Sequence, residues 1–246
     1  MSKLSTLETL TSSIVGGAIR LMSPLFLKEA METNSVACLE YVKQHAMRND
    51  PASVVSVIDT FAANNTMMNV GKSKGAIIDA EIRQKKPGVM AEIGAYTGYS
   101  TVRFAAMQRD IAKAAGIDSH YYSFEYSPEF AARVREIVNF AGLDEQVTVI
   151  EGSFSDQLNI LEDKTVDIYF IDHDDSLYVA DAKKILTSGT LRTGSLLIAD
   201  NILIPGAPEY LAFLDSTPQL EPVLHKVAVD NFSWITDAIS VATFSK

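Results

Sequence analysis

From Pro87 onward the sequence alternates short apolar runs with longer amphipathic segments. This alternation predicts a parallel sheet covered by helices, because each pair of parallel strands needs a long crossover connection. Five runs read as strands, at residues 88–93, 120–125, 146–150, 166–172 and 195–200. Helical apolar spacing is found between them, at residues 101–115, 128–141, 155–161 and 179–187. The sequence therefore predicts an α/β chain with a doubly wound, Rossmann-like sheet and helices on both faces.

Further elements are expected on both sides of this core. Residues 207–216 read as a helix, and 222–229 and 238–244 as two final strands, which makes the sheet seven-stranded and mostly parallel. Residues 38–45, 51–64 and 75–84 read as helices that precede the sheet. No repeat or Pro/Gly/Ser-rich linker divides the chain. We expect a single domain over residues 35–246, with a helical layer at 35–86 and the sheet core at 87–246.

Residues 1–34 form a separate extension of mixed apolar and polar character. Three roles remain open for it: packing against the domain, pairing subunits into a homo-oligomer, or lying on a membrane interface; we favour packing. Its most apolar stretch is interrupted by Arg20 and Pro24 and is shorter than the roughly 20 residues that a membrane span needs. The extension is therefore expected neither to span a membrane nor to act as a signal peptide.

The charge and the cysteine content restrict the partners and the compartment. A net charge of −10 leaves no basic surface for nucleic acid or anionic lipid, so a small molecule is the expected partner. Cys38 is the only cysteine, which excludes an intrachain disulfide and predicts a reducing, cytoplasmic location.

A glycine-containing loop follows the first predicted strand, where open α/β sheets bind ligands. It has the form E-x-G-x-x-x-G and includes Glu92, Gly94 and Gly98. A tight strand-to-helix turn needs glycine as well, so the loop by itself does not prove a ligand site. About 30 residues on, Glu125 ends the second strand, where a carboxylate can accept hydrogen bonds from a ribose. Because the loop departs from the dinucleotide pattern G-x-G-x-x-G, the combination favours S-adenosylmethionine. Ser153 is expected at the border of the adenine pocket, although a plain turn explains it equally well.

Polar side chains also end the fourth and fifth predicted strands. Asp172 ends one, and Asp200 and Asn201 end the next. Two carboxylates and an amide oxygen suit magnesium, which prefers oxygen ligands; capping of the following helices is the simpler alternative. His173 could ligate a metal, transfer a proton or orient a ligand, and we favour the orienting role.

Taken in order, these segments resemble the catechol O-methyltransferase family, from about Cys38 to Ala242. The resemblance is carried by Met68-Asn69-Val70-Gly71 with Lys74-Gly75, by Glu92 to Ser100, and by Asp200-Asn201 with Pro205-Gly206-Ala207-Pro208. It implies a class I methyltransferase fold that uses S-adenosylmethionine and Mg²⁺. The residues that it implies for the cofactor, beside Glu92 and Ser153 above, are Val70, Gly94, Tyr96, Ser100, Glu125, Tyr126 and Asp172. The implied metal ligands are Asp172, Asp200 and Asn201, and the implied substrate contacts include Met68, Asn201 and Pro205.

The sequence departs from this family at the chemical step. The family follows its first metal aspartate with histidine, tryptophan and lysine, whereas here Asp172-His173 is followed by Asp174 and Asp175. The lysine base is therefore replaced by Asp175, and the expected catalytic residues are Asp175, Asp174 and His173. A solvated acidic loop without a catalytic role is an equal alternative for the two aspartates, and His225 or Lys226 could supply the base instead.

The walls of the expected substrate site differ as well. A family tryptophan and a family glutamate appear here as Thr66 and Thr236, and Trp234 and Ile235 are expected to rebuild part of the apolar wall. The resulting prediction is an O-methyltransferase acting on a catechol-like small molecule with an atypical base. Two alternatives remain open: non-methylating chemistry on a metal-chelated substrate, and a cofactor-binding protein without turnover.

Overall fold

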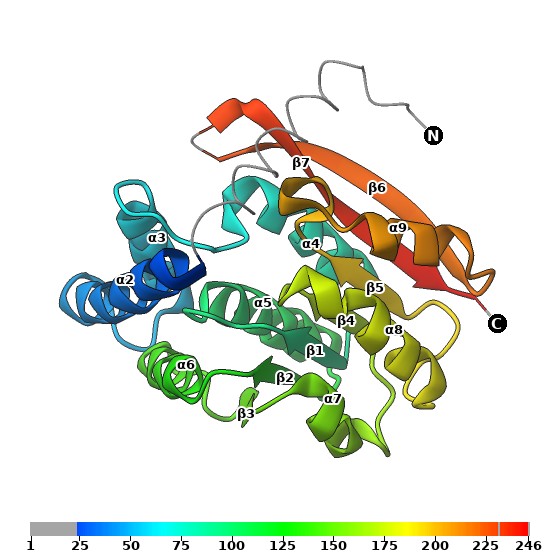
Figure 1. Cartoon of the computed structure of the whole chain (residues 1–246). Helices are drawn as coiled ribbons and strands as arrows, with labels where there is room; N and C mark the ends of the chain where they lie inside the picture. Colours follow the sequence, from blue (N-terminus) through cyan, green and yellow to red (C-terminus); the bar gives the residue numbers. More distant parts are fainter. Residues whose placement is uncertain (1–23, 231, 246) are drawn as a thin grey trace.

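The computed structural model describes residues 24–230 and 232–245. A seven-stranded sheet forms its centre, in the order β3-β2-β1-β4-β5-β7-β6 (Figure 1). The parallel strands are β1 (Val89–Ile93), β2 (His120–Glu125), β3 (Val147–Glu151), β4 (Ile168–Ile171) and β5 (Leu196–Ala199). The last two strands, β6 (Leu220–Val229) and β7 (Phe232–Phe244), form an antiparallel hairpin, and β7 pairs antiparallel with β5. The predicted fold class is confirmed.

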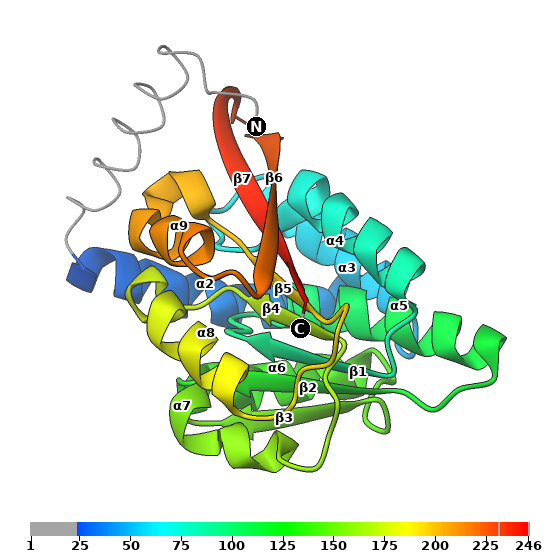
Figure 2. The same ribbon diagram turned by 90° about the vertical axis from the view of Figure 1, so that its right-hand side faces the viewer.

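Helices cover both faces of this sheet (Figure 2). One face carries α2 (Pro24–His45), α3 (Pro51–Ala62), α4 (Gly71–Lys85), α5 (Tyr99–Ala115) and α6 (Pro128–Phe140). The other carries α7 (Phe154–Gln157), α8 (Tyr178–Thr187) and α9 (Pro208–Asp215). Short helical turns η1 (Leu158–Leu161), η2 (Asp175–Leu177) and η3 (Ile202–Gly206) lie between longer elements. In the described part of the chain, no helix combines the length and apolar composition that crossing a membrane would require.

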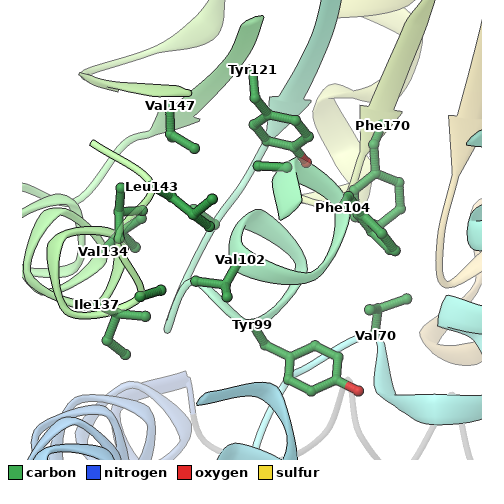
Figure 3. Packing of buried hydrophobic residues seen from close by; sticks show 14 of the residues in the cluster. Val70, Tyr99, Val102, Phe104, Tyr121, Val134, Ile137, Leu143, Val147 and Phe170 are labelled. Carbon is green, nitrogen blue, oxygen red and sulfur yellow. The ribbon is translucent and has the colours of Figure 1, made fainter. Parts of the chain in front are cut away.

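Successive side chains of a strand point to opposite faces of the sheet, so each strand contributes to the apolar core on either face. In β4, Ile168 and Phe170 belong to the apolar cluster under α5, whereas Tyr169 and Ile171 belong to the cluster under α8. Figure 3 shows the first cluster, in which Phe104 of α5 packs edge-on against Phe170 with ring centroids 5.5 Å apart. A strand buried on both faces reads as a continuous apolar run, which is why these strands were predictable.

Most predicted boundaries differ from the structure by one or two residues, and three element starts differ by more. Helix α2 begins at Pro24 rather than at residue 38, so the boundary expected between residues 34 and 35 lies inside it. Helix α4 begins at Gly71 rather than at 75, and β7 begins at Phe232 rather than at 238. The part of the extension that precedes residue 24 lies outside the described residues.

Candidate functional site

The site begins at the point where the strand order reverses. Strands β1 and β4 are neighbours in the sheet although α5, β2, α6, β3, α7 and η1 separate them in sequence, and their carboxyl ends meet. Gly94 follows β1 with a φ of +93°, and a Cβ atom there would clash with the backbone carbonyl of Asp172 after β4. Glycine is therefore required at this position by the close approach of two backbones.

Glu125 holds the glycine loop in place. One of its oxygens accepts hydrogen bonds from the backbone N–H groups of Ala95 and Tyr96, each at 2.9 Å, and the other accepts from Ser127 N at 2.9 Å. The Thr97 hydroxyl donates to Asn69 Oδ1 at 2.8 Å and ties the loop to the segment before α4. Tyr96 has a φ of +50°, and its hydroxyl donates to the Met31 carbonyl at 3.0 Å. The loop is thus pre-formed by contacts with β2, α2 and the α3–α4 connection.

Glu92 is fully buried at the end of this loop's strand. It accepts hydrogen bonds from the hydroxyls of Thr101 at 2.5 Å and Ser123 at 2.7 Å. Burial raises its pKa to about 7, and the Ser100, Thr101 and Ser123 hydroxyls oppose that rise. Within the described residues its Oε1 has no hydrogen-bond partner. A buried, unpaired acceptor of this kind fits the ammonium group of an amino-acid-derived cofactor.

Asp200 and Asn201 lie at the end of β5, in the floor of a cavity of about 760 Å³. Asn201 adopts a left-handed conformation and its Nδ2 donates to the Ile204 carbonyl at 3.0 Å, which leaves the amide oxygen for a ligand. Burial raises the pKa of Asp172, which follows β4, well above its ordinary value, and the negative charge of the Asp200 carboxylate raises it further. The donors fit a hard divalent cation. Across the described residues, no three His, Cys, Asp or Glu side chains come together as a metal-binding group; the expected set is two carboxylates and one amide.

A buried lysine occupies the same floor. Lys74 Nζ lies 2.7 and 2.9 Å from the two carboxylate oxygens of Asp200 and 3.0 Å from Asp237 Oδ2. Burial alone would lower the Lys74 pKa, but the Asp200 and Asp237 carboxylates raise it above its ordinary value. Neither Lys74 nor Asp237 was predicted from the sequence to be a site residue. The adjacency of Lys74 to Gly75 in a family segment was the available signal, and nothing comparable marked Asp237.

The walls of the cavity come from three parts of the chain. The α3–α4 connection and the start of α4 form one side, the turn after β5 forms another, and the β6–β7 hairpin closes the third. All five expected substrate residues line it: Met68, Asn201, Pro205, Trp234 and Ile235. Met68 and Trp234 are exposed, and Ile235 is buried. Asp230 of the hairpin accepts hydrogen bonds from Lys72 N at 2.6 Å and from Ser73 N at 3.2 Å, which joins the hairpin to the first turn of α4.

The expected catalytic residues lie outside the lining of this cavity. Asp174 is exposed and caps η2, since its carboxylate accepts from Ser176 N at 3.0 Å and from the Ser176 hydroxyl at 2.7 Å. Asp175 is half-buried in the same turn. His173 Nε2 lies 2.8 Å from Asp181 Oδ2, and its ring packs on Tyr178. The contacts of His173 with Asp181 and Tyr178 are consistent with the predicted role of His173 in orienting a ligand.

The other residues that were predicted for the site lie in the cavity lining, near the glycine loop or in β6. Val70 lines the cavity, Ser100 is buried at the start of α5, and Ser153 precedes α7. Tyr126 is 78% exposed beside Glu125. The alternative bases His225 and Lys226 lie in β6 opposite Ile239 and Ala238, and neither belongs to the cavity lining.

Comparison with known proteins agrees with this geometry. A family described as a methyltransferase domain matches residues 91–202. The chain is 34% identical over 217 residues to the catechol O-methyltransferase of Mus musculus, covering 86% of this chain and 79% of that protein. It is 35% identical over 181 residues to the enzyme of Sus scrofa, covering 72% of this chain and 93% of that protein.

A solved structure of an O-methyltransferase from Bacillus cereus, in complex with SAH, shares the fold. Its TM-score is 0.63 at 20% identity, and the match covers 85% of this chain and 91% of that one. Together with the glycine loop at the strand reversal and the polar ends of β4 and β5, the sequence relatives show that this chain is a methyltransferase and belongs to the catechol O-methyltransferase family.

Proposed function

We propose that the protein is an S-adenosylmethionine- and Mg²⁺-dependent O-methyltransferase that acts on a catechol-like small molecule. One observation carries the proposal: Asp200 and Asn201, whose oxygens can ligate a metal, line the same cavity as Asn69, which accepts a hydrogen bond from Thr97 of the glycine loop. Transfer of a methyl group needs the donor and the acceptor oxygen to be held within a few ångströms and in line. We expect the glycine loop to hold the methyl donor, and Asp200 and Asn201 to hold the acceptor oxygen through the metal.

The cofactor would be held by the loop and by its supports. Glu92 offers an unpaired carboxylate oxygen to an ammonium group, and Glu125 lies where a ribose hydroxyl can donate to it. The remaining cofactor residues are kept as proposed: Val70, Gly94, Tyr96, Ser100, Tyr126, Ser153 and Asp172. Each lies on or beside the glycine loop, directly before α4 or after a neighbouring strand end.

Magnesium would be held by Asp172, Asp200 and Asn201. When bound, it lowers the pKa of a chelated phenol and neutralises the developing oxyanion. The chain's own residues would exclude water and orient the acceptor: Met68, Pro205, Trp234 and Ile235 line the cavity and would border the substrate. The charged lining includes Asp59 and Asp230, so we expect neutral or cationic catechols to bind better than carboxylated ones.

At the general base the chain departs from its family, because Asp175 replaces the family lysine. Asp175, Asp174 and His173 are the proposed catalytic residues, but a carboxylate near pKa 3.9 is about 6 units too acidic for a phenol near 10, or roughly 8 kcal/mol uphill. His173 is better suited to orient its neighbours, because Asp181 holds its ring. The capping contact of Asp174 supports a structural role for that residue. The replacement of the family lysine by Asp175 is the ground for the second candidate function, non-methylating chemistry on a chelated substrate. A cytoplasmic location stays a prediction that rests on the single cysteine.

The deciding experiment follows S-adenosylhomocysteine release with neutral, cationic and acidic catechols, with Mg²⁺ present or removed by a chelator. The proposal expects release that depends on Mg²⁺ and falls for the acidic catechols. Consumption of substrate without S-adenosylhomocysteine would establish the non-methylating candidate instead. Asp200→Asn is expected to abolish the Mg²⁺-dependent release, and full activity in this variant would refute the metal assignment.

A further inference from the structure

The floor of the cavity contains a cation that belongs to the protein. Lys74 projects from the first turn of α4 and is 9% exposed, and Asp200 and Asp237 beside it are each 1% exposed. Its ammonium group contacts both oxygens of Asp200 and one oxygen of Asp237. Without Lys74, two buried carboxylates would face each other without a counter-charge, which is costly in a region of low dielectric.

This contact competes with the expected metal site. Both oxygens of Asp200 accept a hydrogen bond from Lys74, and Oδ1 also accepts from Asn201 N at 2.6 Å. A divalent cation that takes Asp200 as a ligand needs one of those oxygens, and it repels an ammonium group at this distance. Lys74 therefore has to yield Asp200 for a metal to bind.

Asp237 provides a position to which Lys74 can withdraw. Its Oδ1 accepts from the backbone N–H groups of Leu203 and Ile204, each at 3.0 Å, and from Ala238 N at 2.7 Å. These bonds hold the carboxylate in place independently of Lys74, so that Oδ2 stays directed at the ammonium group. Asp237 also fixes the turn after β5 that carries Pro205.

We propose that Lys74 and Asp237 are positioning residues for the metal site: Lys74 neutralises Asp200 while no metal is bound and is retained by Asp237 when Mg²⁺ takes Asp200. The inference rests on the proposed function, because it presumes that Asp200 is a metal ligand. It predicts effects of opposite sign for the two partners. Removing the ammonium group frees Asp200 and strengthens Mg²⁺ binding, whereas removing the Asp237 charge leaves Lys74 on Asp200 and weakens it.

The test is a calorimetric titration of the full chain with Mg²⁺, in the absence of methyl donor and substrate. Lys74→Met is expected to tighten Mg²⁺ binding at least about tenfold, and Asp237→Asn to weaken it by a similar factor. Lys72→Met is the matched control. Lys72 lines the same cavity, but its side chain is 71% exposed and its Nζ lies 3.8 Å from Asp59, so we expect a change within about twofold.

A purely structural role would weaken Mg²⁺ binding in both Lys74→Met and Asp237→Asn, so unchanged or weaker binding by Lys74→Met overturns the inference. Should Lys74→Met fail to fold, as judged by circular dichroism, Lys74→Gln must show the same tightening. Failure of the two proposals can be told apart. A wild-type chain that binds no Mg²⁺ refutes the metal site itself, whereas normal wild-type binding with an unaffected lysine variant refutes only the role of Lys74 and Asp237.

Discussion

At the scale of single residues, Glu92 shows how burial changes the chemistry of an ordinary carboxylate. It is fully buried, and its pKa is raised to about 7, above the usual value of 4.5. Between these two pH values the folded protein keeps a proton that the unfolded chain releases. The contribution of Glu92 to the free energy of unfolding therefore falls by roughly 3 kcal/mol as pH rises from about 4.5 to 7.

Glu92→Gln removes this pH dependence while retaining an acceptor for the Thr101 and Ser123 hydroxyls. We expect the variant to gain stability relative to the wild type as pH rises from 5 to 8. Urea unfolding of both proteins at several pH values measures the difference between their free energies of unfolding. The contributions of the other titratable groups cancel in this difference. Parallel stability curves for the two proteins would show that Glu92 titrates normally.

The replacement of the family lysine is also a question about one residue. Asp175→Lys places an amine of pKa near 10.4 where the family has its base, matched to a phenol near 10. We expect S-adenosylhomocysteine release with simple catechols to rise at least about tenfold. Asp174→Lys serves as the control, because it removes the cap of η2 and is expected to bring no gain. Equal rates in the wild type and Asp175→Lys would mean that another group is the base.

At the scale of elements, the turn between β1 and α5 depends on glycine for steric reasons. Gly94→Ala places a Cβ against the Asp172 carbonyl at a φ of +93°, and we expect a loss of more than about 2 kcal/mol in the free energy of unfolding, with weakened cofactor binding. Gly116→Ala is the matched control. It has a φ of +67° in open space, so only the backbone cost of about 1 kcal/mol applies. Denaturant unfolding compares the two, and similar losses would contradict the clash.

Asp230 joins the hairpin to the first turn of α4, in addition to the contact between Lys74 and Asp237. Asp230→Ala removes the acceptor of Lys72 N and Ser73 N, and we expect a loss of about 1 kcal/mol together with a severalfold higher KM, because the hairpin borders the cavity. Asp50→Ala is the comparison, since Asp50 caps α3 through Ser53 N at 3.0 Å and does not line the cavity. It should lose similar stability at unchanged KM. An unchanged KM for Asp230→Ala would mean that the contact of Asp230 with α4 does not contribute to substrate binding.

At the scale of the whole molecule, the site joins the strand reversal, α4 and the hairpin, so a ligand bound there stabilises the folded chain as a unit. S-adenosylhomocysteine at 100 times its Kd is expected to add about 2.7 kcal/mol, which for a chain of this size raises Tm by about 5–10 °C. A thermal melt with NAD as the control should show no shift. A shift with NAD alone would reverse the choice of cofactor made from the E-x-G-x-x-x-G loop.

Much of this architecture could be predicted from local sequence patterns. Strands β1, β4 and β5 are buried on both faces and therefore read as apolar runs, and β2 was predicted with both of its bounds. The glycine loop and the polar residues that follow β4 and β5 are equally local, because each is a short pattern next to a strand end. Helix starts were less predictable. The start of α4 is stabilised by Asp230, a residue 157 positions from Ser73, and no local cap marks it.

The sequence by itself determined the elements, their order and the residue types that end the strands, since these depend on near neighbours in the chain. Only the tertiary structure decided which of those ends meet. The strand order places β1 beside β4, and the folded chain brings Lys74 to Asp200 across 126 positions and to Asp237 across 163. Contacts between such distant residues leave no periodic trace in a sequence, because the pairing is fixed by the burial of whole faces of the sheet and not by any local preference.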